Sequence, residues 1–342
     1  MIVKIVMLYG LSWHTLIDKF LTKGKLMYLS EVNGKGGIVA RVVAASQSAY
    51  CGTKMTTFEI EFPRFILAEV NTHCMLEKNA ASSRAIPVAK MLENLKENHA
   101  TPIHWGKNQA GMVADKEVDA EIAQKAKELW ESAFATVEGI CYEMIDLGIH
   151  KQVANRLNEP FQIVKMVISG TEWNNFFYLR MHEDADPHFQ ELARCMYEAA
   201  SKAEYETLYE DEWHVPYVKT YREANGKRYY LDNNGDYIST FTARQVSASC
   251  CAQVSYRKCD DSIEKAEAVF DKLNIGSKTK PAHASPTTHQ ATPMNLPTDV
   301  KTRPDMWPEG VTHIDRYYDC WSGKLKNWIQ FRKLIANESK RG

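Results

Sequence analysis

The sequence predicts a mixed α+β protein, with a mixed or antiparallel sheet and long helices, on three observations. Polar and apolar residues alternate strictly from Thr57 to Phe62, which is typical of a β-strand. Two long segments, 115–148 and 187–210, repeat apolar residues at helical spacing. Asn234-Gly235 stands between aromatic and β-branched flanks, a pattern that predicts a β-hairpin.

Size and composition indicate a folded globular protein. The chain has 342 residues, of which 44% are hydrophobic and 25% charged, so it can bury a substantial core. Its formal net charge of −1 provides no overall basic field that would attract a nucleic-acid polymer or an anionic membrane. A small anionic ligand held by a few local arginines remains compatible with this charge.

The cysteine pattern argues against a structural metal site. Eight cysteines are present without a Cys-x-x-Cys pair, and we therefore expect no zinc and no other metal. Scattered thiols in a chain of this length are typical of a reducing compartment.

The chain begins with an apolar segment, residues 1–21. Lys4, His14, Asp18 and Lys19 interrupt it, so it predicts a strand or helix packed on the body of the protein and not a targeting segment. We expect residues 1–35 to form an N-terminal extension and residues 36–342 to form a single domain.

The alternating stretch predicts a half-buried strand. Its inward face carries Phe58, Ile60 and Phe62, and its solvent face carries Thr57, Glu59 and Glu61. The apolar run 65–70 follows directly, so the polar stretch 71–87 is expected on or just beyond a regular element.

The remaining segments predict helices and a loop. Segment 115–148 has acidic residues in its first turn and Gly148 past its end, as amphipathic helices commonly do. Segment 187–210 predicts a second helix and 261–274 a third. The tract 277–304 is rich in Pro, Ser and Thr and predicts a loop.

Several common sites are excluded by spacing. Gly34–Gly37 lacks the glycine pattern and the following helix of a dinucleotide-binding loop, and no Gly-x-Ser-x-Gly elbow is present. The segment between His283 and His289 contains hydroxyl groups but no carboxylate or thiolate, so the sequence favours two surface-loop histidines over metal ligands.

Arg84, Arg156 and Arg180 are each framed by apolar residues. A guanidinium in such a place either forms a structural ion pair or binds an anion such as phosphate. Since Arg84 follows Ser82 and Ser83, the three arginines together favour an anionic nucleotide site.

The stretch 71–87 resembles the signature of the flavin-dependent thymidylate synthases. Thr72-His73-Cys74 occupies the positions of its Arg-His-Arg, and Asn79, Ser82 and Arg84 fall on its Asn, Ser and Arg. Segment 171–193 is similar to the Asn-Phe-x-x-Leu-Arg block of the family, and 212–218 to a block of its longer, often phage-borne members. Segments 250–256 and 283–290 resemble its two flavin-site blocks.

The order of these blocks is permuted. The two flavin-site blocks precede the signature in compact members, whereas here they follow it. The resemblance therefore implies the fold of that family in a circularly permuted form. We expect Ser255, His283 and Ser285 to fold back beside residues 58–84.

The resemblance implies C5 methylation of dUMP to dTMP. Methylenetetrahydrofolate would donate the carbon, and FAD reduced by NADPH would donate the hydride. The implied assembly is a homotetramer with sites at subunit interfaces, in the cytoplasm of a bacterium or a phage-infected host. The implied partner is a pyrimidine deoxynucleotide monophosphate, with no nucleic-acid polymer and no membrane.

Motif positions assign the site residues. Arg180 would act in catalysis by facing the pyrimidine and stabilising negative charge on its carbonyls. The implied substrate-binding residues are Glu69, Ser82, Ser83, Arg84, Arg156 and Arg180. The implied flavin-binding residues are Thr72, His73, Cys74, Asn79, Asn175, Ser255, His283, Ser285 and His289.

This chain departs from the family at several cofactor positions. Thr72, Cys74 and Gln253 replace arginines, Glu77 replaces a Ser, and Thr288 replaces a Glu. Glu69 replaces a Gln near the nucleotide, and a carboxylate accepts from an amino group, as on cytosine. Two alternatives therefore remain: hydroxymethylation of dUMP or dCMP, and a non-catalytic nucleotide-binding homologue.

Overall fold

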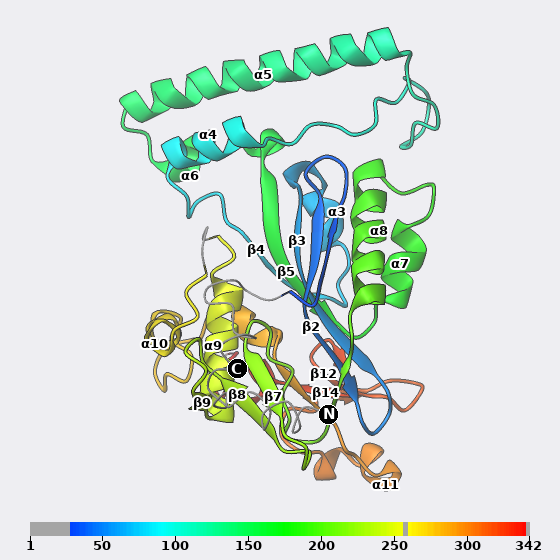
Figure 1. The fold of residues 1–342 in the computed structure, drawn as a ribbon, viewed down its shortest axis with the longest axis vertical. Coiled ribbons are helices and arrows are strands. Elements are labelled where there is room, and N and C mark those ends of the chain that lie inside the picture. Colours follow the sequence, from blue (N-terminus) through cyan, green and yellow to red (C-terminus); the bar gives the residue numbers. More distant parts are fainter. Residues whose placement is uncertain (1–27, 256–258, 340–342) are drawn as a thin grey trace, which may run out of the picture.

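The computed structural model describes residues 28–255 and 259–339, so the predicted segment 1–21 lies outside it. A six-stranded sheet lies at the centre (Figure 1), with the order β1-β2-β3-β5-β4 and β6 beside β2. Its strands are β1 (Ser30–Asn33), β2 (Val39–Ser48), β3 (Lys54–Pro63), β4 (Glu77–Ala80), β5 (Ile163–Gly170) and β6 (Glu206–Leu208). All pairs are antiparallel except β2–β6. The predicted α+β class is confirmed.

Strand β3 is buried on both faces, so the prediction of a half-buried strand was wrong. Thr57 has no exposed surface, and Glu59 is 3% exposed. The second face is covered because His214 and Tyr217 bond to Thr57 and Glu59 from a distant segment. Lys165, 3.0 Å away, offsets the buried charge of Glu59.

Helices α7 (Asn174–Arg180) and α8 (Pro187–Lys202) lie side by side along the central sheet (Figure 1). The Asp186 carboxylate caps α8 by accepting from the backbone N–H groups of His188 and Phe189. The buried side chains of α8 share one core with Phe58. The predicted helix 187–210 ends earlier because its last part forms β6, which pairs with β2.

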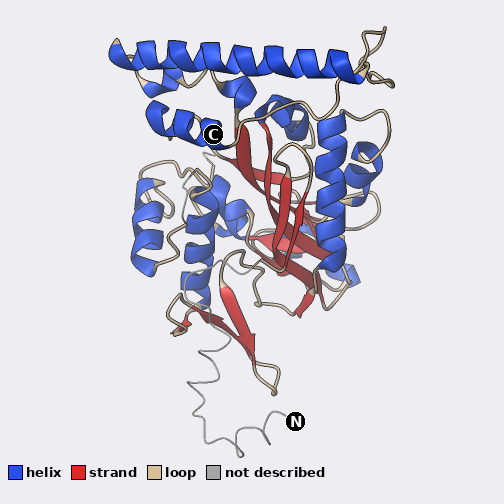
Figure 2. Ribbon diagram, turned by 45° about the horizontal axis from the view of Figure 1, so that its top comes forward, coloured by secondary structure: helices blue, strands red, loops and turns tan. Residues whose placement is uncertain are grey.

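The long helix α5 (Ala120–Asp146) crosses one end of the sheet, over α4 (Val88–Glu97) and α6 (Lys151–Ala154) (Figures 1 and 2). The predicted helix is confirmed with a later start, and Gly148 takes a φ of +73° beyond its end. Phe134 and Cys141 are its only buried residues, and they pack in a cluster with α4.

A second antiparallel sheet and two helices follow in the chain. They are β7 (Lys219–Arg222), β8 (Arg228–Leu231), β9 (Tyr237–Ile238), α9 (Thr240–Ala252) and α10 (Ile263–Lys272). The predicted hairpin is confirmed as β8–β9, and Gly235 adopts a φ of +92° in its turn. The third predicted helix is confirmed as α10.

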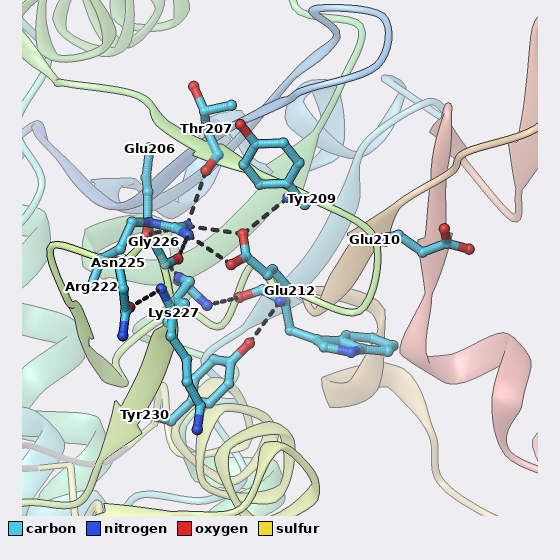
Figure 3. A network of polar contacts seen from close by, with 12 residues as sticks. Glu206, Thr207, Tyr209, Glu210, Glu212, Arg222, Asn225, Gly226, Lys227 and Tyr230 are labelled. Carbon is cyan, nitrogen blue, oxygen red and sulfur yellow. Dashed lines mark hydrogen bonds and ion pairs between the residues drawn. The ribbon is translucent and has the colours of Figure 1, made fainter.

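An ion-pair network joins the two sheets (Figure 3). Arg222 contacts Glu212 at 2.7 Å and Glu206 of β6 at 3.1 Å. Arg228 approaches Glu206 at 2.8 Å. Because β6 belongs to the central sheet, these contacts anchor β7 and β8 to it.

The tract 277–304 is more ordered than the loop predicted for it. It contains the 3₁₀ helix η3 (Ser285–Thr288), β10 (Ala291–Pro293), α11 (Thr298–Lys301) and the start of η4 (Pro304–Met306). β10 pairs with β14 (Trp328–Gln330), and this pairing draws the tract inside the protein. His289 is fully buried, so its placement as a surface-loop histidine was wrong, whereas His283 is exposed.

Short elements complete the fold. They are η1 (Arg64–Ile66), α3 (Leu67–Asn71), η2 (Glu159–Phe161), β11 (His313–Ile314), β12 (Cys320–Ser322), β13 (Leu325–Lys326) and η5 (Phe331–Leu334). Within residues 28–255 and 259–339, no helix is long and apolar enough to span a membrane. The same residues hold no group of three or more potential metal ligands of the His, Cys, Asp or Glu type.

Candidate active site

The loop 81–86, here called the Ser82 loop, follows the edge strand β4. The backbone N–H of Ser82 donates to Oγ of Ser255 over 3.0 Å. The side-chain amide of Asn79 donates to the carbonyl of Cys251 over 3.4 Å. The end of α9 therefore lies against β4, as the permuted order of the blocks predicts for Ser255.

Asn155 fixes the backbone of the Ser82 loop, and Glu159 accepts a hydrogen bond from one of its hydroxyl groups. Asn155 is 1% exposed, and its amide donates to the carbonyls of Ser83 and Ile86 at 2.8 and 2.9 Å. The Ser83 hydroxyl donates to Oε1 of Glu159 over 3.0 Å. A loop held at both ends in this way presents its polar groups without a large loss of conformational entropy on binding.

Two arginines flank this loop. Arg84 is exposed and has no ion-pair partner among the residues that the structure describes. Arg156 lies just past α6, where its Nη1 is 2.8 Å from Glu159. An unpaired guanidinium beside two Ser hydroxyls suits a phosphate group.

A second group of polar residues surrounds Arg180 at the end of α7. Arg180 Nε donates to Nε2 of His73 over 2.7 Å, and Nη2 lies 3.5 Å from Oγ1 of Thr72. The guanidinium carbon stands 4.7 Å from the ring centre of Phe189. Within the described parts of the chain no carboxylate forms an ion pair with Arg180, so its charge is available to an anionic ligand.

His73 is neutral near pH 7. Burial, together with the charges of Arg180 and Lys78, lowers the pKa of His73 to about 4. Since Nε2 accepts from Arg180, the ring proton resides on Nδ1. His73 and Phe189 therefore orient Arg180 without neutralising it.

Glu69 belongs to the same neighbourhood. Burial raises the pKa of the Glu69 carboxyl, and Asp186 adds to this effect, whereas Arg180 and His188 oppose it. A partly buried carboxylate near a free guanidinium can accept a hydrogen bond from a base amino group.

The Ser82 loop and the Arg180–His73 pair are two separate groups of hydrogen-bonded residues among those the structure describes. No hydrogen bond or ion pair between described residues joins them. The loop follows the edge strand β4, whereas α7 packs beside α8 on the helix-covered side of the sheet. Of the expected substrate residues, Ser82, Ser83, Arg84 and Arg156 lie together, while Glu69 and Arg180 lie elsewhere.

The expected flavin-binding residues differ in their exposure to solvent. Thr72, Cys74, Asn175, His283 and Ser285 are exposed. His289 is fully buried, with Nδ1 2.8 Å from Oγ of Ser169 and with Nε2 unpartnered. Gln253 turns inward to the backbone of Asp260, and Thr288 donates to the carbonyl of Ser285.

The local charge fits an anionic cofactor such as FAD. Glu77 is 8% exposed, accepts from Gln330 over 3.1 Å and lies 3.8 Å from Lys324. Lys78 stands beside them, and burial with the charge of Lys324 lowers the pKa of Lys78. The ammonium groups of Lys78 and Lys324 together outweigh the single carboxylate of Glu77, so the net charge at this position is positive.

The sequence analysis did not select two residues near the Ser82 loop, Arg64 and Asn155. Arg64, 15% exposed at its side chain, lies 3.2 Å from Glu159. Its apolar setting, Phe62-Pro63-Arg64-Phe65, is the same signal that identified Arg84, Arg156 and Arg180. Asn155 has no such signal, because its role depends on backbone carbonyls that only the fold brings close.

Comparison with known proteins identifies a family for this chain. The family model described as thymidylate synthase complementing protein matches residues 25–204, more than half of the chain. A solved structure of a UMP/dUMP methylase, PolB from Streptomyces cacaoi bound with 5-Br UMP, is similar at 15% identity and a TM-score of 0.42, covering 49% of this chain and 91% of that chain. No curated protein matches.

The matched segment contains both the Ser82 loop and the Arg180–His73 pair. Residues 250–289, with the two resembling flavin-site blocks, lie beyond it. The chain therefore belongs to the thymidylate synthase complementing protein family, the flavin-dependent thymidylate synthases.

Proposed function

We propose that this protein methylates C5 of dUMP to give dTMP, with methylenetetrahydrofolate as carbon donor and NADPH as the reductant of FAD. The observation that carries the proposal is the Arg180 guanidinium, which has no carboxylate partner among the described residues and is oriented by the neutral His73 within the matched family segment. A fixed cation of this kind stabilises negative charge that develops on the pyrimidine carbonyls during alkylation at C5.

The Ser82 loop would bind the phosphate of the nucleotide. Ser82, Ser83 and Arg84 supply hydroxyl and guanidinium donors, and Arg156 joins them. Glu69 would face the base, since it lies in the neighbourhood of Arg180. These groups bind and orient the nucleotide, whereas the hydride chemistry belongs to the flavin when it is bound.

The flavin would lie near the signature segment. Thr72, His73, Cys74 and Asn79 would contact it there, with Asn175, Ser255, His283 and Ser285 from the other blocks. His289 has no exposed surface, so it would support the site from inside the protein and not by contact with the flavin. Lys78 and Lys324 support this placement because they supply positive charge beside Glu77.

We further propose a homotetramer with active sites at subunit interfaces. In a single chain the Ser82 loop and the Arg180–His73 pair are not in contact. In such an assembly one subunit would hold the phosphate of the nucleotide, and a neighbouring subunit would supply Arg180 to its base. Residues 36–342 would act as one catalytic domain in each subunit, together with β1 (Ser30–Asn33), which belongs to the central sheet although the sequence assigned it to the N-terminal extension.

The direct test is turnover by the purified full-length chain. We expect yellow protein that oxidises NADPH only when dUMP and methylenetetrahydrofolate are both present, and that releases dTMP. Colourless protein that cannot be reconstituted with FAD would contradict the proposal.

One observation favours a second candidate, hydroxymethylation of dUMP or dCMP. Glu69 presents a carboxylate where the family has an amide, and a carboxylate accepts a hydrogen bond from the amino group of cytosine. Addition of water to the transferred methylene consumes no hydride. Mass spectrometry of the product separates the two reactions, because the hydroxymethyl product carries one more oxygen.

A further inference from the structure

Three hydrogen-bond donors converge on a single oxygen beside the Ser82 loop. Oε1 of Glu159 lies 2.8 Å from Arg156 Nη1, 3.0 Å from Ser83 Oγ and 3.2 Å from Arg64 Nη2. The donors come from three separate parts of the chain, namely η1, the Ser82 loop and the segment after α6.

Glu159 is the only acidic partner of both arginines among the described residues. Two guanidinium groups therefore share one carboxylate, and the exposed Arg84 adds a third cation nearby in the chain. The local charge is positive even with Glu159 ionised. Guanidinium donors in such a surplus suit an anion more highly charged than a carboxylate.

The terminal oxygens of a phosphate monoester accept from the same donors. Ser83 and Arg156 are among the residues proposed above to hold the phosphate of the nucleotide, yet in the free chain both are bonded to Glu159. A phosphate that binds them must therefore compete with this carboxylate.

We propose that Glu159 occupies the place of the nucleotide phosphate in the free chain, and that Arg64 is a further phosphate-binding residue of the site. This inference rests on the proposed function. On binding, Arg64, Arg156 and Ser83 transfer from the carboxylate to phosphate oxygens, and Glu159 moves aside. Glu159 is 25% exposed at its side chain, whereas Ser83 is buried, so the carboxylate has room to move while the loop stays in place.

A purely structural role for Glu159 leads to the opposite result. If Glu159 only braces the Ser82 loop, then Glu159→Gln loosens the loop and weakens nucleotide binding. If Glu159 competes with phosphate, the same change removes a competing negative charge and strengthens binding.

The test is calorimetric titration of the full-length chain with dUMP and with deoxyuridine, which lacks the phosphate. We expect Glu159→Gln to bind dUMP at least threefold more tightly and Arg64→Ala at least tenfold more weakly, since a charge-assisted hydrogen bond contributes about 1.5–3 kcal/mol. Arg64→Lys should fall between Arg64→Ala and the unmodified chain. Deoxyuridine affinity should not change in any of these variants.

Glu212→Gln is the matched control, because Glu212 also pairs with an arginine but lies in the network of Figure 3, away from the Ser82 loop. It should leave dUMP affinity unchanged. Weaker dUMP binding by Glu159→Gln, or equal loss of dUMP and deoxyuridine binding in Arg64→Lys, would overturn the inference. If the unmodified chain binds no pyrimidine monophosphate, both proposals fail; tight binding without turnover contradicts only the proposed reaction.

Discussion

Arg180 and His73 form a hydrogen bond of 2.7 Å although 107 residues separate them in the chain. The bond requires a neutral imidazole that accepts through Nε2, and burial of His73 provides it by lowering its pKa to about 4. Because Nε of Arg180 is used in this way, the guanidinium is fixed in orientation while part of its fork remains free for a ligand.

Loss of this guanidinium should reduce catalysis. We expect Arg180→Ala to lower kcat for dUMP about 100- to 1000-fold, the usual effect of removing a preorganised donor from a developing oxyanion. Steady-state kinetics under saturating nucleotide measures the change. Arg194→Ala, which removes an exposed arginine from the neighbouring helix α8, should leave kcat unchanged. A kcat within threefold of the unmodified value would exclude Arg180 from the reaction.

The charge of Arg180 should also be detectable at His73. In Arg180→Met the pKa of His73 should rise above about 4 because a neighbouring cation is lost, yet remain below 6.5 because burial is the larger cause. Titration of the His73 ring by NMR measures it. Lys78→Gln should raise the pKa less, since Lys78 contributes less than Arg180. An unchanged pKa in Arg180→Met would contradict this account of the pair.

Arg84 should contribute to affinity and not to folding. Arg84 is exposed without an ion-pair partner among the described residues, so Arg84→Ala removes no stabilising contact of its side chain. We expect dUMP binding at least tenfold weaker and an unchanged thermal midpoint. Titration calorimetry and circular dichroism measure the two quantities. Unchanged affinity would remove Arg84 from the nucleotide site.

The fold could be predicted from sequence where the pattern is local. The β8–β9 hairpin and α5 follow from turn residues and helical periodicity, which act over a few neighbouring positions. The burial of Glu59 could not be predicted, since a carboxylate in an alternating strand looks exposed until Tyr217, from a distant segment, covers it. The burial of Glu59 is therefore set by tertiary contacts and not by the local sequence pattern.

The candidate site was also predictable in part: the residues with a motif were found from sequence, and those that depend on tertiary contacts were not. Motif spacing identified Ser82, Arg84 and Arg180, because the chemistry of a nucleotide site requires those residue types. It gave no indication that Glu159 satisfies Ser83 and Arg156 in the free chain, or that His289 lies inside the protein. Both facts depend on which segments the fold brings together.

His289 and His214 belong to one buried chain of hydrogen bonds. Ser169 contacts His289 at 2.8 Å and Thr57 at 2.6 Å, and Thr57 contacts His214 at 2.8 Å. Burial lowers the pKa of each histidine to about 3. Both imidazoles are therefore neutral in the folded protein at any pH well above 3.

This burial should make the protein sensitive to acid. An unfolded histidine titrates near 6.5, so between about pH 6.5 and pH 3 the unfolded chain binds protons that the folded chain excludes. The free energy of unfolding therefore contains the full contribution of the two neutral histidines above pH 6.5, and this contribution declines as the pH falls toward 3. Each histidine adds a slope of up to about 1.4 kcal/mol per pH unit to the free energy of unfolding.

Replacement of one buried histidine should reduce that slope. We expect the free energy of unfolding of His289→Gln, measured with urea at pH 7, 6 and 5, to fall less steeply with decreasing pH than that of the unmodified chain. Glutamine lacks a titrating group, so the unfolded chain of the variant binds one proton fewer on acidification. His283→Gln is the matched control, because His283 is exposed in the same tract and should leave the slope unaltered. If His289→Gln keeps the original slope, protonation of the buried histidine does not contribute to acid unfolding.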